Sequence, residues 1–367
     1  MNKWDAWLVQ GLVVLVLGIA VLQTVGADRL SGVLFYLTFP LTVALWLRSV
    51  RETVTWEDVC LLMTVAVAVA CVLLGAVIHG TGAGFDYWKK PIMFMTTLLY
   101  FQAASRLRAV AGLKAFVGRG ILLAAVVFLA MFLLRREEMY TIAGVPSAYL
   151  TFGFTNPNLA TLFLAMMAML LFCRARETKR WYYAVAAVWM AVFVVLTGAR
   201  NAMLALAVFG LLCLLRWERV RVPGLWTWMP LVFAVAYLLL LPAVQPLLHW
   251  LGRDGKALDS RWEIWQQAWR ALTASPLLGG YDAVSQGTGM FQMHNSHLDL
   301  AVSYGVPVLI LVCVLLRRWL KYCRGVYAPA AVGAVLLGCA EAAVFSGGLG
   351  IYILAGLPLL LAKEEMA

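Results

Sequence analysis

The stretch that decides the fold is residues 6–25, AWLVQGLVVLVLGIAVLQTV, which holds no charged side chain over twenty positions. A helix needs about 20 consecutive apolar residues to cross a bilayer, so this run predicts a membrane-spanning helix. The whole chain has the same character, because 63% of its 367 residues are hydrophobic and only 13% are charged. A water-soluble globule could not bury so much apolar surface.

Similar apolar runs recur along the chain and predict about twelve transmembrane helices. The spans are expected at residues 6–25, 31–47, 58–78, 91–105, 119–134, 158–175, 182–197, 201–215, 223–247, 298–316, 327–345 and 349–362. They leave room for one integral membrane domain over residues 1–367 and for no separate soluble domain. The sequence therefore predicts an all-α polytopic membrane protein.

Positive charge is distributed unevenly between the segments that join these spans. With the N-terminus inside the cell, 19 of the 29 Lys and Arg residues fall in inner segments and ten in outer ones. Cytoplasmic loops of membrane proteins carry such an excess, so we expect both termini in the cytoplasm. The net charge of +11 then mainly reflects topology, which argues against a nucleic-acid partner.

The longest outer segment is residues 248–297, and long loops in compact proteins are usually functional. Within it, Ser260 followed three residues later by Glu263 forms a capping-box pattern that predicts the start of a helix. Trp265 and Trp269 lie on the apolar face of that helix. We expect an amphipathic helix at the outer membrane–water interface, with Trp265 as a candidate substrate contact.

Four outer cations are candidates for binding an anion. Arg261 lies in the middle of the apolar face of the expected helix, where it could also extend its charged end to water. Arg200 stands in the short turn TGARN, where it could instead anchor at the lipid headgroups. A guanidinium binds phosphate oxygens in pairs, so a diphosphate is the natural ligand of both arginines. Lys89 and Lys90, in DYWKKP, could hold phosphate or anchor at the interface.

A histidine segment begins where the long loop re-enters the membrane, at HNSHLD. A neutral imidazole can take a proton near neutral pH, as attack by a sugar hydroxyl requires, which makes His294 a candidate general base. Asn295 and His297 are candidate substrate contacts, although most histidines at such positions only complete hydrogen bonds. His294, His297 and Asp299 could also suggest a metal site, but no HExxH motif or further ligand cluster supports one.

Other motifs limit the remaining classes of protein. The chain holds no P-loop, GxGxxG, GxSxG or DxD-type pair of acids, which removes support for an ATP-driven pump and for a nucleotide-sugar glycosyltransferase. Its seven cysteines form no CxxC pair and are interpreted as small core residues. Glu341 lies inside an apolar span, where it is protonated, paired within the bundle or part of an ion relay.

Four segments, taken in order, resemble the O-antigen ligase and polymerase family of bacterial membrane glycosyltransferases. They are GFTNPNLATLFLAM (153–166), LTGARNAMLAL (196–206), DSRWEIWQQAWRALTASPLLGGY (259–281) and HNSHLDLAVSYGVPVLIL (294–311). The first third of the chain matches only in hydropathy. The histidine motif of the family is His-Asn, nine residues and then Gly, which fits His294, Asn295 and Gly305. The chain departs from the family pattern at Val308, where Gly, Thr or Tyr is frequent.

The resemblance implies an all-helical fold of the GT-C type, with the outer loop 248–297 over the site. It implies an enzyme of the bacterial cytoplasmic membrane that takes a glycan from an undecaprenyl-diphosphate carrier. The glycan would be joined to a hydroxyl of a glycan or glycolipid acceptor, with no metal, nucleotide sugar or other cofactor. Arg200, Arg261 and His294 would be the catalytic residues; the expected partners are the donor, the acceptor and membrane lipids.

Two other readings stay open besides a surface-polysaccharide polymerase of the same family. A SEDS-type peptidoglycan polymerase also uses lipid-linked sugar and needs a catalytic acid in the outer loop, where Asp254, Asp259, Glu263 and Asp282 stand. A secondary transporter or lipid flippase would need charges at the membrane midplane. Glu341 is nearly alone there, and the chain shows no internal repeat.

Overall fold

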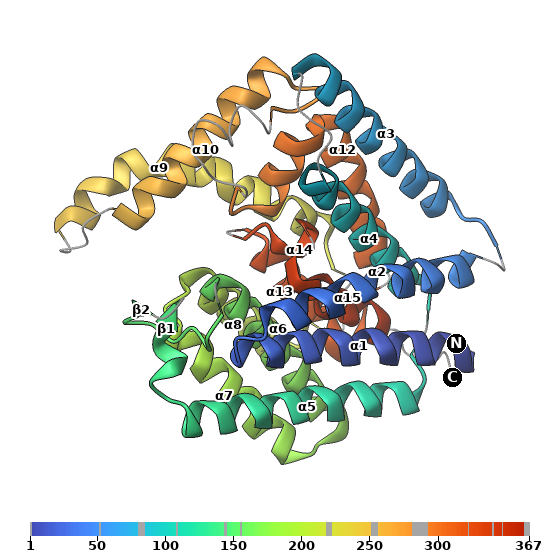
Figure 1. Cartoon of the computed structure of the whole chain (residues 1–367), viewed down its shortest axis with the longest axis vertical. Helices are drawn as coiled ribbons and strands as arrows, with labels where there is room; N and C mark the ends of the chain where they lie inside the picture. The colour runs from blue at the N-terminus through green and yellow to red at the C-terminus, as the bar shows by residue number, and fades with distance from the viewer. Residues whose placement is uncertain are drawn as a thin grey trace.

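The computed structural model describes residues 2–50, 53–79, 85–107, 109–142, 145–154, 156–217, 222–250, 256–280, 293–321, 323–339, 341–346 and 348–362. Within these ranges the chain is helical apart from turns, short connections and one hairpin of two-residue strands (Figure 1). The predicted all-α class is therefore confirmed.

Most of the helices overlap the predicted spans, with ends that differ by up to several residues. Helices α1 to α8 are Lys3–Thr24, Asp28–Val50, Trp56–His79, Phe85–Arg106, Ala111–Leu134, Pro157–Thr178, Trp181–Leu196 and Arg200–Leu214. The later helices are α9 Met229–Trp250, α10 Lys256–Ala274, α12 Ser296–Lys321, α13 Ala328–Leu337, α14 Ala343–Ser346 and α15 Ile351–Leu361. Strands β1 Thr141–Ile142 and β2 Val145–Pro146 pair antiparallel, and 3₁₀ turns occupy Glu138–Tyr140, Gly224–Trp228, Gly325–Tyr327 and Gly348–Gly350.

Several helices have the length and composition of membrane spans. Among the described residues, α1, α2, α3, α5, α6 and α12 are long and apolar enough to cross a membrane, and five shorter apolar helical stretches accompany them. Helix α4, predicted as a span over residues 91–105, is not in either group. It carries Lys89 and Lys90 near its start, and it packs inside the bundle against α2 and α15. The membrane class is supported, while the number twelve stays a prediction.

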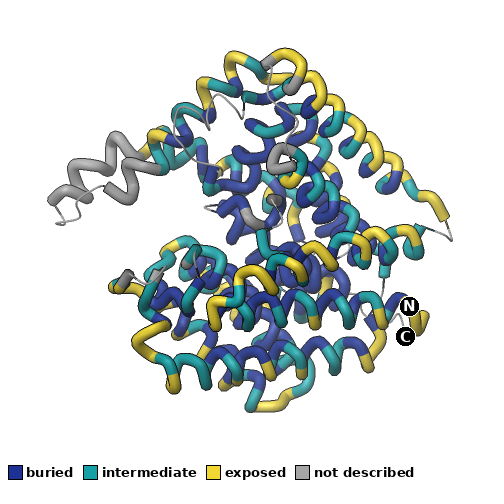
Figure 2. The backbone as a smooth tube through the Cα atoms, viewed as in Figure 1, coloured by how far each residue is buried: buried dark blue, intermediate teal, exposed yellow. Residues whose placement is uncertain are grey.

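Burial separates the inner helices from the outer ones (Figure 2). Helices α6 and α12 are the most enclosed of the six long spans, and α7, α8, α13 and α15 pack against α6. Helices α1, α2, α3 and α5 each keep exposed apolar side chains, such as Val14 on α1 and Leu123 on α5. An apolar face that the bundle leaves uncovered is what contact with lipid requires.

Helix α10, inside the predicted outer loop, begins earlier than its sequence indicates. It starts at Lys256, so the prediction that Ser260 caps it is wrong. Lys, Ala and Leu in the residues before Ser260 are good helix formers and already continue the helix, so no cap is needed there.

Helix α10 has a buried and an exposed face, as predicted for an amphipathic helix, but Trp269, predicted on the apolar face, is 46% exposed. Ile264, Trp265 and Ala268 are buried, whereas Glu263 and Arg270 are exposed. The buried face packs against α9 and α12, so protein covers it. Location of this helix at the membrane interface stays a prediction.

Helix α12 has a kink, and the segment that follows α10 packs against it. Gly305 interrupts the helix with φ 83°, in the left-handed region, and a Cβ there would lie 2.0 Å from the carbonyl oxygen of Leu277. Val306 N donates to Pro276 O at 2.9 Å, in place of a bond within the helix. Only glycine combines this φ with so close an approach, and the kink fixes the C-terminal end of α10 against α12.

The predicted span 327–345 is not one helix, which corrects the sequence prediction. It divides into α13, which ends at Leu337, and the short α14, which begins at Ala343. Glu341 stands in the break between them. Irregular backbone at membrane depth is tolerated only where its polar groups are satisfied by protein or water.

Donor groups from two other parts of the chain satisfy the carbonyl groups freed by this break. The carbonyl oxygens of Leu337, Gly338, Cys339 and Glu341 accept hydrogen bonds from Asn201 Nδ2, Ser296 N, Asn295 Nδ2 and Ser296 Oγ, at 2.9, 2.8, 2.8 and 2.9 Å. Gly338 lies so close to Ser296 that a Cβ would meet its hydroxyl oxygen at 2.5 Å. The break is therefore held between the start of α8 and the start of α12.

Candidate functional site

A pocket of about 490 Å³ lies where the α7–α8 turn, α10 and the α13–α14 break meet. Its volume falls within the ~300–1,000 Å³ common for ligand sites. The polar and charged residues of its lining are Ser147, Tyr149, Thr151, Asn158, Thr161, Thr197, Arg200, Asn201, Tyr237, Arg261 and Glu341. Two arginines, one carboxylate and several hydroxyl and amide groups thus share one cavity.

Arg200 reaches this pocket because a tight turn places it at the first position of α8. Gly198 in that turn has φ 67°, and the ring of Tyr149 lies where its Cβ would be, at 2.6 Å. Asn201 Nδ2 donates to Leu337 O at 2.9 Å and so ties the start of α8 to the end of α13. Arg200 itself is exposed and lines the pocket.

Arg261 approaches the pocket from α10. Its Nη2 lies 3.5 Å from Glu341 Oε1, and its side chain is 32% exposed. The arginine is therefore directed towards a carboxylate that lines the pocket, on the side of α10 that also carries Trp265. This geometry leaves part of the guanidinium accessible to a ligand.

His294 lies beside the same carboxylate, just before α12. Its Nδ1 is 3.5 Å from Glu341 Oε2, a long separation for a hydrogen bond, and its side chain is 20% exposed. The backbone at His294 has φ 49°, which is uncommon for a residue with a side chain. Residues held in such sparsely populated conformations often belong to functional sites.

Trp265 joins α10 to the segment that precedes His294. Its indole Nε1 donates to Met293 O at 2.6 Å, and its fully buried ring packs against Tyr237 and Phe233. Trp265 also lines the pocket, so the predicted substrate contact has an anchoring role as well.

Asn295 and His297, two predicted substrate contacts, hold the start of α12 in place. Asn295 Oδ1 accepts from the backbone N–H groups of His297 and Leu298, at 3.1 and 2.9 Å, while its Nδ2 donates to Pro230 O and Cys339 O. His297 Nε2 lies 2.6 Å from Thr227 O, and its side chain is buried. Both side chains contact protein in this structure.

The three residues considered for a metal site are directed to different partners. His294 lies beside Glu341 and His297 beside Thr227, whereas Asp299 Oδ1 pairs with Lys90 Nζ at 3.0 Å. Their side chains do not form a ligand cluster.

Lys89 and Lys90 lie on α4, and neither is among the residues that line the pocket. Lys90 is paired with Asp299 of α12, whose Oδ1 also accepts from Met293 N at 3.2 Å. The ion pair supports the segment that positions His294. Lys89 is exposed at its own position on α4.

Glu341 is the site residue that sequence reasoning did not assign to the site. The signal was present, because an acidic residue within an apolar span is a functional candidate that needs a partner. Its partners, Arg261 and His294, come from 80 and 47 residues away in sequence, and only the fold brings them to it.

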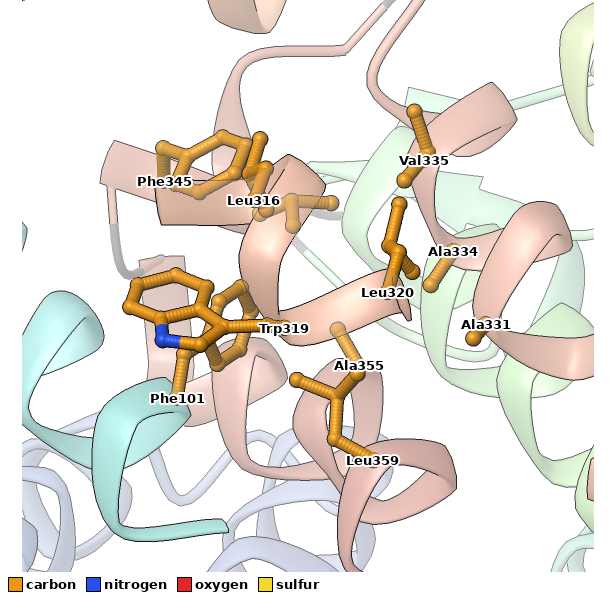
Figure 3. A pocket seen from close by; sticks show the side chains of 11 residues that line it. Phe101, Leu316, Trp319, Leu320, Ala331, Ala334, Val335, Phe345, Ala355 and Leu359 are labelled. Atoms are coloured by element: carbon orange, nitrogen blue, oxygen red, sulfur yellow. The ribbon is translucent and has the colours of Figure 1, made fainter. Parts of the chain in front are cut away.

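A second cavity offers no comparable chemistry. It measures about 20 Å³ and lies among apolar side chains of α4, α12, α13, α14 and α15, including Phe101, Leu316 and Leu359 (Figure 3). A space that small holds about one water molecule, and its apolar walls give a water few partners.

Comparison with known proteins shows a family resemblance over part of the chain. The family model described as O-antigen ligase matches residues 185–313, a range that includes Arg200, Arg261 and His294 but not Glu341. No curated protein matches the chain. The chain is therefore similar to the O-antigen ligase family over residues 185–313, about a third of its length.

Proposed function

We propose that the protein transfers a glycan from an undecaprenyl-diphosphate carrier to a hydroxyl of a glycan or glycolipid acceptor. The family match supports glycosyltransferase activity of the O-antigen ligase or polymerase type. The observation that carries the finer proposal is the pocket of about 490 Å³ lined by Arg200, Arg261 and Glu341, with His294 beside Glu341.

The two arginines suit the leaving group. When the glycan leaves its carrier, negative charge concentrates on the diphosphate, and preorganised cations in a poorly hydrated site stabilise that charge. Arg200 is exposed at the start of α8, and Arg261 is 32% exposed, so each can present N–H groups to phosphate oxygens. A guanidinium does this with two parallel bonds.

In this proposal His294 acts on the hydroxyl group of the acceptor. A hydroxyl is a weak nucleophile until a base removes its proton, and His294 is the group we assign to that task. The oxygen then attacks the anomeric carbon while the bond to the diphosphate breaks. Attack from the side opposite the leaving group inverts the anomeric centre.

The site belongs on the outer side of the bacterial cytoplasmic membrane in this proposal. The excess of Lys and Arg in alternate segments supports cytoplasmic termini and an outer position for residues 248–297. The same segment forms one side of the pocket through α10, within a single membrane domain of GT-C type over residues 1–367.

Of the alternatives, transport draws least support from the structure. A transporter would use Glu341 as an isolated midplane charge, but it lies 3.5 Å from both Arg261 and His294. A polymerase differs from a ligase only in its acceptor, a second copy of the glycan. A SEDS-type polymerase could use an acid of the outer loop. The side chains of three such acids lie outside the part of the chain that the structure describes: Asp254, Asp259 and Asp282.

Deletion of the gene in its own bacterium tests the proposal. We expect loss of one surface glycan and accumulation of that glycan on undecaprenyl diphosphate, both reversed by the wild-type gene. Complementation with Arg200→Ala or Arg261→Ala should fail at normal protein levels. Arg270→Ala is the matched control, because Arg270 is exposed on the same helix as Arg261 and does not line the pocket. If the deletion strain had normal levels of the surface glycan and of the glycan on undecaprenyl diphosphate, the proposal would be contradicted.

A further inference from the structure

The position of Glu341 depends on contacts with distant parts of the chain. The break between α13 and α14 removes it from regular helix, and hydrogen bonds from Asn295 and Ser296 hold the adjacent backbone. These two donors follow His294 directly in sequence. The backbone of the carboxylate and that of the histidine are therefore fixed against each other.

The carboxylate divides its two oxygens between two functional groups. Oε1 lies 3.5 Å from Arg261 Nη2, and Oε2 lies 3.5 Å from His294 Nδ1. Its side chain is only 8% exposed, so water competes little for these oxygens. A small adjustment on substrate binding would bring both contacts to ordinary hydrogen-bond length, as is common for catalytic groups.

We propose that Glu341 is a positioning residue that keeps His294 in the tautomer required of a general base. This inference rests on the proposed glycosyl transfer. The Glu341 carboxylate accepts the Nδ1 proton, so the lone pair is on Nε2, the ring nitrogen that meets the acceptor hydroxyl. Glu341 then stabilises the imidazolium that forms.

The step balances without any further reactant. Nε2 takes the hydroxyl proton as the acceptor oxygen bonds to the anomeric carbon. The bond from that carbon to the diphosphate oxygen breaks, and its electron pair leaves with the diphosphate. The imidazolium afterwards returns its proton to the diphosphate or to water.

A second consequence concerns Arg261. In the absence of donor, Glu341 neutralises part of its charge and keeps the guanidinium at the pocket wall.

The test compares Glu341→Gln, Glu341→Asp, His294→Ala and the double variant His294→Ala/Glu341→Gln in the full-length protein. The donor is the lipid-linked glycan extracted from the deletion strain, and its envelope fraction supplies the acceptor. We expect Glu341→Gln to lower kcat about 10²-fold, within the range of general-base help, with little change in the donor KM. Glu341→Asp should restore part of the rate.

The double variant separates positioning from a general structural role. If Glu341 acts through His294, adding Glu341→Gln to His294→Ala should change kcat less than about twofold, because residues that act as a unit are not additive. Multiplicative losses would overturn the inference. Glu177→Gln is the matched control, since Glu177 is also paired, with Lys114 and Arg174, but lies away from the pocket.

The outcomes distinguish this inference from the proposed function. Should the wild-type protein transfer no glycan, the proposed function fails. If the wild-type protein transfers glycan and the Glu341→Gln variant has the same kcat, only the role assigned to Glu341 is wrong. Thermal melting and binding of undecaprenyl diphosphate monitor folding, and Glu341→Asp enters the same cycle if the Gln variant does not fold.

Discussion

His294 combines an uncommon backbone conformation with the position expected of a base. A φ of 49° is higher in conformational free energy for histidine than a helical φ. Such strain persists only where contacts with the surrounding structure hold the backbone in place. Trp265 and Asp299 hold Met293 on one side through hydrogen bonds, and Asn295 on the other side donates to Pro230 O and Cys339 O. The histidine side chain is thereby directed to Glu341 rather than into the packed start of α12.

Replacement of His294 should affect the chemical step more than donor binding. We expect His294→Ala to lower the transfer rate by roughly 10²–10⁴-fold, the usual contribution of a general base. Initial rates and binding of undecaprenyl diphosphate measure the two effects.

The neighbouring histidine provides the comparison. His297→Ala should lower the melting temperature, because His297 is buried and contacts Thr227 O, while folded protein keeps most of its transfer rate. Equal and complete loss of donor binding in both histidine variants would remove the assignment of His294 as base.

Arg261 tests whether the pocket recognises an anion by shape as well as by charge. Arg261→Lys should still impair transfer, because lysine keeps the charge but lacks the planar fork that binds phosphate oxygens in pairs. Complementation of surface glycan in the deletion strain is the measurement. Full activity of this variant would indicate that Arg261 only extends its charge to the interface.

Among the elements, the kink of α12 fixes the pocket from a distance. Gly305→Ala would place a methyl group 2.0 Å from Leu277 O at φ 83°, and we expect it to cost at least about 1–3 kcal/mol and to lower the melting temperature. Gly210→Ala on α8 is the control, since nothing lies within 4 Å of its Cβ position and alanine favours a helix. Similar melting temperatures for the two variants would contradict this role of the kink.

The helical elements were predictable where a long apolar run decides them. The run at residues 6–25 predicted α1 within three residues at its start, and the apolar face of α10 was predicted from its periodicity. The break at Glu341 was not predicted, because Gly338 is the only local signal and the surrounding residues are apolar. The donors that stabilise the broken backbone, Asn201 and Asn295, come from elsewhere in the chain.

At the scale of the whole molecule, sequence placed the candidate site in a few segments but did not assemble it. Arg200, Arg261 and His294 were identified singly, from turn, periodicity and resemblance. Their common relation to Glu341 depends on tertiary packing of α8, α10 and α12 against the α13–α14 break. Lys90 was predicted to be a site residue, but in the structure it forms an ion pair with Asp299 beside the site.

The orientation of the molecule is a prediction that labelling can test. A membrane-impermeant thiol reagent applied to intact cells should label a cysteine introduced at Gly255, in the outer segment 248–297. A cysteine at Ala111, at the start of α5, should be labelled only after the membrane is opened. The opposite pattern would invert the topology.

The most direct test of the central claim is release of undecaprenyl diphosphate by the purified protein in proteoliposomes supplied with lipid-linked glycan and acceptor. We predict one molecule of undecaprenyl diphosphate released for each glycan transferred, unaffected by EDTA and absent in Arg261→Ala. Movement of intact lipid-linked glycan across the bilayer without cleavage, or release that EDTA abolishes and a divalent metal restores, would contradict the account.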